Sequence, residues 1–119
     1  MKKIIIIALS ASLLTLVGCG KTWTSAETKP AVATDAFAKC VTAAWAKMYW
    51  ADTCPHCQNQ KALLGDTFQY ITYINCNKTP NECTAANISK IPTWQFKDGT
   101  QEVGEKTLQE LAKKTDCSL

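Results

Sequence analysis

The chain has no arginine, so the side chains that carry a full positive charge at neutral pH are lysines. Its single histidine is His56. Apart from Lys2 and Lys3, the lysines nearly balance the 10 acidic residues. A surface that binds nucleic acid needs a clear basic excess. The composition therefore gives no indication of a nucleic-acid partner.

The chain also lacks an apolar run long enough to span a bilayer comfortably. Its apolar stretch at residues 4–17 follows two lysines and closes with Leu16-Val17-Gly18-Cys19, which is the layout of a targeting signal. This tetrapeptide resembles a bacterial lipobox, and the resemblance implies a lipoprotein signal peptide at residues 1–18 and a lipid on Cys19. An ordinary secretory signal with an incidental cysteine and an uncleaved membrane anchor are the alternatives.

These features predict an exported protein that a lipid holds at the cell envelope of a bacterium. It would face the periplasm or the outer side of the cytoplasmic membrane, and which membrane holds the lipid stays open. Residues 19–33 are mostly polar and show no steady period, so we expect the lipidated Cys19 to be followed by a flexible tether. Residues 34–119 suffice for one small domain.

Cysteine, in contrast, is plentiful. The chain has 7 cysteines, and with Cys19 set aside an even number remains, as three disulfides would need. Disulfides persist in exported proteins. By position we expect Cys76 to pair with Cys83 across a loop, and Cys40 in the first helix to pair with Cys117 in the last. A second, redox-active role for Cys76 and Cys83 is the alternative, and the pairing itself cannot be read from sequence.

The two other cysteines form the motif Cys54-Pro55-His56-Cys57, directly after an apolar segment and before a helix-like one. At the first turn of a helix, the positive end of the helix dipole stabilises the leading thiolate. We expect Cys54 to be the exposed attacking sulfur and Cys57 the buried sulfur that resolves the mixed disulfide. The imidazole of His56 either supports the Cys54 thiolate or is a solvated linker residue.

The domain alternates helix and strand patterns. Thr79 and Thr107 each stand three residues before a glutamate, as capping residues at helix starts do. Asp98-Gly99 between two strand patterns predicts a two-residue hairpin turn. The predicted elements are a helix at 35–46 whose apolar face includes Trp45, a strand at 47–51, a helix from 54 to about 65, a strand at 70–75, a helix at 80–87, strands at 93–97 and 100–103, and a helix at 108–116.

Several motifs in this order resemble the thioredoxin superfamily. They are Trp50-Ala51 before the Cys-x-x-Cys, Ile91-Pro92-Thr93, and Phe96-Lys97-Asp98-Gly99. The resemblance implies an α/β fold, a mixed four-stranded sheet flanked by helices in a single small domain. It also implies that Pro92 is cis and lies beside the dithiol, and that Ile91 pairs its main chain with a substrate peptide. Trp50 and Thr53 complete the expected substrate-binding residues, and no metal or other cofactor is implied.

Within the superfamily, the sequence is similar to the thioredoxin-like domain that accompanies bacterial and plant vitamin K epoxide reductase homologues. The similar segments are Cys-Pro-His-Cys-Gln-Asn-Gln-Lys, Tyr-Ile-Asn-Cys, the Pro-Thr-Trp run and the terminal Lys-Lys-Thr-Asp-Cys. This resemblance implies a membrane-embedded, quinone-linked partner that reoxidises the domain, and exported proteins with thiols or disulfides as clients. Because this chain has no such membrane domain, the partner would be a separate protein.

Two positions depart from these relatives. Thr53 stands where an aromatic residue is usual, and Met48 stands where thioredoxins carry a buried acid that helps to deprotonate the second cysteine. Loss of this acid makes a general reductase less expected, and stabilisation of the Cys54 thiolate favours an oxidant of thiols. A disulfide reductase or isomerase is the main alternative.

Two further alternatives have no redox chemistry. One is a lipoprotein that keeps the fold as a binding module and has lost catalysis. The other is a structural zinc module built from Cys54, Cys57, Cys76 and Cys83, although the spacing of the second pair is too long for a usual zinc site.

Overall fold

The computed structural model describes residues 30–119. The predicted signal peptide, Cys19 and the first part of the predicted tether lie outside these residues. The elements are α1 (Asp35–Ala43), β1 (Lys47–Trp50), α2 (Pro55–Leu64), the 3-10 helix η1 (Gly65–Tyr70), β2 (Thr72–Asn75), α3 (Pro80–Ala85), β3 (Thr93–Gln95), β4 (Gln101–Val103) and α4 (Leu108–Thr115). None of the helices in this part of the chain has the length and apolar character needed to cross a membrane.

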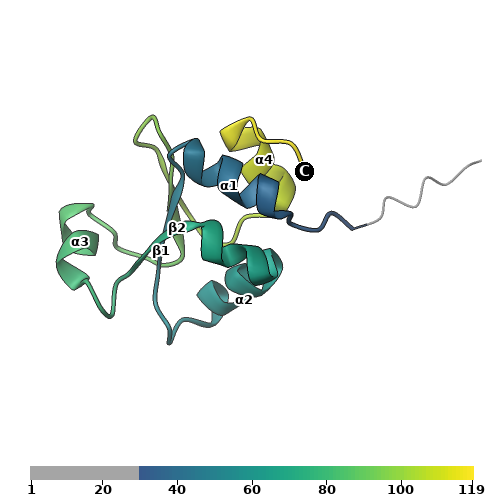
Figure 1. Ribbon diagram of the computed structural model, residues 1–119. Helices are drawn as coiled ribbons and strands as arrows, with labels where there is room; N and C mark the ends of the chain where they lie inside the picture. The colour runs from purple at the N-terminus through teal and green to yellow at the C-terminus, as the bar shows by residue number, and fades with distance from the viewer. Residues whose placement is uncertain (1–29) are drawn as a thin grey trace, which may run out of the picture.

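The strands form one sheet in the order β2-β1-β3-β4. β1 pairs parallel with β2 and antiparallel with β3, and β3 pairs antiparallel with β4. α3 lies on one side of the sheet, while α1, α2 and α4 lie on the other (Figure 1). The predicted fold class is confirmed: this is a small α/β domain with a mixed four-stranded sheet and a thioredoxin-like arrangement of helices.

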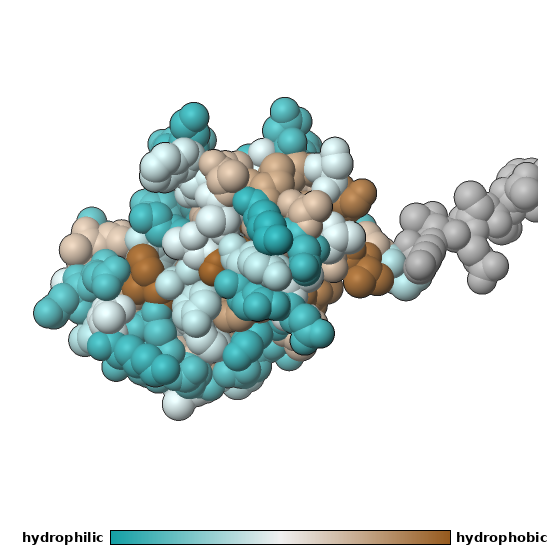
Figure 2. Space-filling view, in the orientation of Figure 1, coloured by the Kyte–Doolittle hydropathy of each residue, from teal (hydrophilic) through white to brown (hydrophobic). Residues whose placement is uncertain are grey.

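The main core lies between the sheet and the larger group of helices. Met48 and Trp94 pair across β1 and β3, and both are fully buried. Because side chains alternate along a strand, Tyr49 between Met48 and Trp50 points to the opposite face, where it is also buried. On the outer surface, hydrophobic side chains are separated by hydrophilic ones over most of the visible face (Figure 2). The helices contribute Phe37, Ala38, Val41, Cys57, Leu64, Phe68, Leu108 and Leu111 to the core.

The last residues of the predicted tether pack against the domain. Ala33 is buried, and Ala31 packs against the same core, although both were assigned to the tether. The packed domain therefore begins a few residues before residue 34.

α1 ends earlier than predicted, because Trp45 adopts a left-handed backbone conformation with φ of 64°. The amide of Trp45 donates to the carbonyl of Thr42, and the amide of Ala46 donates to that of Val41. This hydrogen-bond pattern is a Schellman motif, which normally favours glycine at the left-handed position. The prediction that Trp45 lies on the apolar helix face is wrong, since its side chain is 71% exposed.

Two predictions of local structure were wrong in detail. Tyr70 ends the 3-10 helix and does not begin the second strand. The hairpin turn has three residues, because the amide of Gly99 donates to the carbonyl of Phe96, and Phe96 pairs with Thr100. Only Gly99 has a positive φ in this turn, whereas a two-residue type I′ turn needs two such residues.

The two predicted helix caps differ in the structure. Thr107 and Glu110 form a complete capping box at the start of α4. Thr79 makes no side-chain cap at α3, because its hydroxyl donates to the carbonyl of Asn75 instead.

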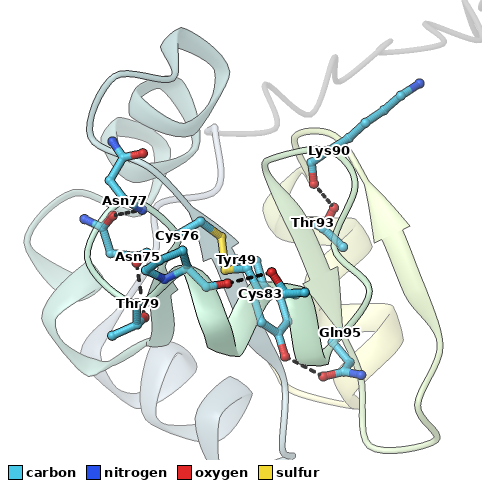
Figure 3. Close-up of a disulfide and its surroundings, with 11 residues drawn as sticks. Tyr49, Asn75, Cys76, Asn77, Thr79, Cys83, Lys90, Thr93 and Gln95 are labelled. Atoms are coloured by element: carbon cyan, nitrogen blue, oxygen red, sulfur yellow. Dashed lines mark hydrogen bonds between the residues drawn. A yellow bond between two sulfur atoms is a disulfide. The ribbon is translucent and has the colours of Figure 1, made fainter.

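Both predicted disulfides are present. Cys40 of α1 is joined to Cys117, which follows α4, and Cys76 is joined to Cys83. The first closes a long loop that contains the whole sheet. The second joins the end of β2 to α3. It lies close to Tyr49, on the side of the sheet that α3 covers (Figure 3). Cys54 and Cys57 are the cysteines of residues 30–119 that remain as thiols.

Candidate active site around Cys54 and Cys57

The two free cysteines lie at the start of α2. Cys54 directly precedes the helix, and Cys57 lies in its first turn. Pro55 is the first residue of the helix, where its missing amide hydrogen costs nothing and its fixed φ suits the helix. Cys54 is therefore the N-cap. Its sulfur accepts a hydrogen bond of 3.3 Å from the amide of Cys57. This is the position at which a helix stabilises an anion, so the geometry favours a thiolate on Cys54.

The two sulfurs have different surroundings. The side chain of Cys54 is half-buried, whereas Cys57 is completely inaccessible to solvent. Burial, with an added contribution from the hydrogen bond to Cys54, raises the pKa of the Cys57 thiol to about 12. Cys57 therefore holds its proton at neutral pH, and Cys54 is the sulfur that a substrate can reach.

The loop before β3 lies against Cys54. The peptide bond between Ile91 and Pro92 is cis, as the resemblance implies. The Cys54 sulfur donates to the carbonyl of Ile91 over 3.7 Å, and the amide of Gly104 donates to the carbonyl of Pro92. Within residues 30–119 the amide of Ile91 has no hydrogen-bond partner. This amide is the backbone group that an extended substrate could pair with beside the sulfur.

A groove of about 510 Å³ borders the same loop. Its lining combines apolar side chains with charged ones, so an extended peptide could bury an apolar residue there and keep polar contacts at the rim. The lining residues are His56, Lys90, Ile91, Pro92, Val103, Gly104 and Glu105.

His56 contacts Glu105 and not the Cys54 sulfur. Its Nδ1 lies 2.7 Å from Oε1 of Glu105, and Nδ2 of Asn59 donates to the same oxygen over 3.1 Å. These two hydrogen bonds lower the pKa of the Glu105 carboxyl. The pair therefore joins the first turn of α2 to the loop after β4 and closes one side of the groove.

Of the two residues predicted to complete the substrate-binding site, Trp50 is buried and Thr53 is exposed. The ring of Trp50 packs edge-on against Phe68 and Tyr73 at centroid distances of 5.5 Å. Its side chain lies in the core and is not among the residues that line the groove, so its predicted part in substrate binding stays a prediction. Thr53 is exposed next to Cys54, and its hydroxyl oxygen accepts from Asn77 over 3.4 Å.

Gln60 is a buried polar residue that the sequence analysis missed. Its Oε1 accepts from Nε1 of Trp94 and from the amide of Lys106, and its Nε2 donates to the carbonyl of Lys106. It thus ties the active-site helix to the segment that carries Glu105. The signal was present in the sequence, because Gln60 lies three residues after Cys57 and four before Leu64, on the buried face of α2.

A zinc site built from four cysteines is contradicted by the structure. Two of its proposed ligands, Cys76 and Cys83, are joined to each other. Across residues 30–119 no group of three or more His, Cys, Asp or Glu side chains is arranged to hold a metal ion.

The sequence was also compared with those of known proteins. No family model matches the chain. Thiol-disulfide oxidoreductase LTO1 of Arabidopsis thaliana is 36% identical over 93 residues, which cover 71% of this chain and 24% of that protein. The chain thus spans much less than half the length of this relative. Together with the free dithiol and the two disulfides, the similarity supports a thiol–disulfide redox function in general terms.

Proposed function

We propose that the protein is a thiol–disulfide oxidoreductase that uses Cys54 and Cys57 to oxidise thiols of exported proteins. One observation carries this proposal. A reachable sulfur at the N-cap of α2 lies against the Ile91 carbonyl, with a fully buried second thiol one turn behind it. This arrangement provides an attackable sulfur, a resolving sulfur and a backbone site for an extended substrate.

In the oxidising direction, a substrate thiolate attacks the sulfur of Cys54 in the Cys54–Cys57 disulfide. The bond between the two cysteines breaks, and Cys57 leaves with the electron pair and takes up a proton. A second substrate thiolate then attacks the substrate sulfur of the mixed disulfide and releases Cys54 as a thiolate. The substrate loses two electrons and forms one disulfide, and the protein gains the two electrons as a dithiol.

The contacts around Cys54 suit this direction. The amide of Cys57 and the N-terminus of α2 stabilise the Cys54 thiolate, which stabilises the reduced form. Met48 is buried in the core where a reductase of this superfamily would carry an acid, as the resemblance implies. These features favour a disulfide donor over a reductase or isomerase.

A glutathione redox titration tests the direction. The full chain carrying Cys19→Ser is equilibrated over a range of potentials, and the Cys54–Cys57 couple is followed by alkylation and mass spectrometry. A potential at or above about −180 mV supports a disulfide donor, and one near −270 mV indicates a reductase. A chain in which this couple does not titrate would contradict the redox function and leave the binding module as the better reading.

We further propose that Cys19 carries a lipid and that a separate, membrane-embedded, quinone-linked protein reoxidises the domain. The lipobox-like tetrapeptide and the resemblance to domains that accompany vitamin K epoxide reductase homologues support this proposal. Metabolic labelling with a fatty acid in a bacterial host tests it. The wild-type chain should take up label and remain with membranes, whereas a Cys19→Ser variant should do neither.

A further inference from the structure

Asn75 is a buried polar residue at the end of β2, in the Tyr-Ile-Asn-Cys segment, and only 8% of it is exposed. Its carbonyl accepts from the amides of Lys78 and Thr79, and its Oδ1 accepts from the amide of Asn77 over 3.0 Å. These contacts shape the loop that leads to α3 (Figure 3). The side-chain amide group of Asn75 is directed elsewhere, toward the turn that follows β1.

This amide group contacts the turn that carries Cys54. Nδ2 of Asn75 donates to Oδ2 of Asp52 over 2.8 Å. On the other side of the same turn, Nε2 of Gln58 donates to the backbone carbonyl of Asp52, also over 2.8 Å. The amide of Cys54 closes the turn on the carbonyl of Ala51. Asp52 is thus held both by Gln58 of α2 and by Asn75 of β2.

The position of the Cys54 sulfur depends on this turn. At the N-cap the sulfur must stay within reach of the Cys57 amide at 3.3 Å, which is the contact that stabilises a thiolate, whereas only the protonated thiol can donate to the Ile91 carbonyl at 3.7 Å. Neither contact is strong enough to fix the chain by itself, because hydrogen bonds to sulfur are weak. A hydrogen bond from a nearly buried amide to the Asp52 carboxylate is a stronger restraint.

We propose that Asn75 is a positioning residue for Cys54. Through the Asp52 carboxylate it holds the turn that places the Cys54 sulfur at the N-terminus of α2, and it thereby keeps this sulfur reactive. The inference rests on the proposed function of the dithiol.

Two substitutions of Asp52 separate position from charge. Asp52→Ala and Asp52→Asn both remove the negative charge near Cys54. Removal of this charge by itself favours the thiolate, and it does so equally in both variants. Only Asp52→Asn keeps an oxygen that can accept from Asn75, and both variants leave the other contacts of Asn75 in place. The measurement is the rate of Cys54 alkylation by iodoacetamide as a function of pH in the full chain carrying Cys19→Ser, with peptide mapping to identify the modified cysteine.

We expect Asp52→Ala to react roughly threefold to tenfold more slowly than Asp52→Asn at neutral pH, with its rate profile displaced to higher pH. Equal rates in the two variants would overturn the proposal. A purely structural role would lower the melting temperature of Asp52→Ala without separating the two pH profiles.

An exchange of the two side chains provides a second test. Asn75→Asp places two carboxylates against each other and should slow the alkylation of Cys54. Adding Asp52→Asn restores a donor facing an acceptor, and the rate should recover. Failure to recover would count against the proposal. Asn81→Asp, on the exposed face of α3, adds the same charge as a matched control and should leave the rate unchanged. Alkylation reports on Cys54 directly, so a failure of the redox titration would refute the proposed function without deciding this inference.

Discussion

Two parallel neighbours in the sheet, β1 and β2, are each followed by a short loop and a helix that begins with proline. After β1, the cysteines occupy the N-cap and the third position of α2, where Cys54 and Cys57 remain as thiols. After β2, Cys76 directly follows the strand and Cys83 lies one turn inside α3, and the two are joined. The same local pattern thus carries a reactive pair in one unit and a closed pair in the other.

The difference lies in what occupies the N-cap. At α2 the N-cap is a cysteine whose sulfur accepts the Cys57 amide, so the helix end acts on the sulfur. At α3 the N-cap is Thr79, whose hydroxyl donates to Asn75 and makes no cap. A cysteine reacts as a thiolate, and only one of the two units places a cysteine where a helix stabilises that charge.

The largest effect expected concerns the reactive pair. Cys54→Ser should abolish disulfide exchange, whereas Cys57→Ser should leave Cys54 able to form a mixed disulfide that cannot be resolved. Intact-mass analysis after reaction with oxidised glutathione measures the adduct. If a Cys54→Ser variant formed an adduct on Cys57 at the wild-type rate, the N-cap position of Cys54 would not be the source of the reactivity of this pair.

Of the two disulfides, the one between Cys40 and Cys117 should contribute more to the free energy of unfolding. These cysteines are separated by 77 positions, and closing a loop of this length stabilises by about 4.5 kcal/mol in the chain-entropy model. Replacing both cysteines by alanine should lower the free energy of unfolding by about this amount in denaturant titrations. A loss below about 1 kcal/mol would show that the unfolded chain gains little freedom when this bond is removed.

Removal of the disulfide between Cys76 and Cys83 tests directly whether this pair is structural or redox-active. With a separation of 7 positions, its removal should cost about 2.5 kcal/mol on the same model. If this pair is structural, a Cys76→Ala/Cys83→Ala variant keeps the reduction potential of the Cys54–Cys57 couple. A second couple that titrates at mild potential in the wild-type chain, and a shifted potential in the variant, would instead show a redox relay.

The stability of the reduced protein should fall at alkaline pH because of Cys57. Burial raises the pKa of this thiol from 9.0 to about 12, so between these values the folded protein holds a proton that the unfolded chain loses. The contribution is complete below pH 9.0 and is lost as the pH rises toward about 12. The free energy of unfolding of the reduced chain, measured as a function of pH, should show this loss. A Cys57→Ala variant serves as the control, because it keeps the lysines and tyrosines that also titrate in this range. Parallel pH profiles in the two chains would contradict the prediction.

The smallest effect expected is that of Glu105→Gln. The pair of His56 and Glu105 lies at the surface, and exposed ion pairs contribute little to stability. Its hydrogen bonds lower the pKa of Glu105 below 4.5, so any stabilisation is present above this pH and lost below it. The thermal melts of variant and wild type should therefore coincide in acid and differ only slightly at neutral pH. A large change in the reduction potential would show that the pair acts on Cys54 through His56.

The sequence by itself determined most of the fold and the central part of the site. Period and capping signals placed the strands and helices in order, and the motif Cys54-Pro55-His56-Cys57 identified the dithiol, because a proline after an N-cap residue is a local signal. The complete capping box at Thr107 and Glu110 was predicted for the same reason. Such features depend on contacts within a few residues, which the sequence contains in full.

Only the tertiary structure decided which distant residues meet at the site. Glu105 reaches His56 from the loop after β4, and Asn75 reaches Asp52 from the end of β2. No local pattern marks either pair, because each contact depends on how strands and loops pack after folding. The tertiary structure also decided the burial of two tryptophans. Trp50 belongs to the core because β1 is covered on both faces, and Trp45 is exposed because a left-handed turn ends α1 before it.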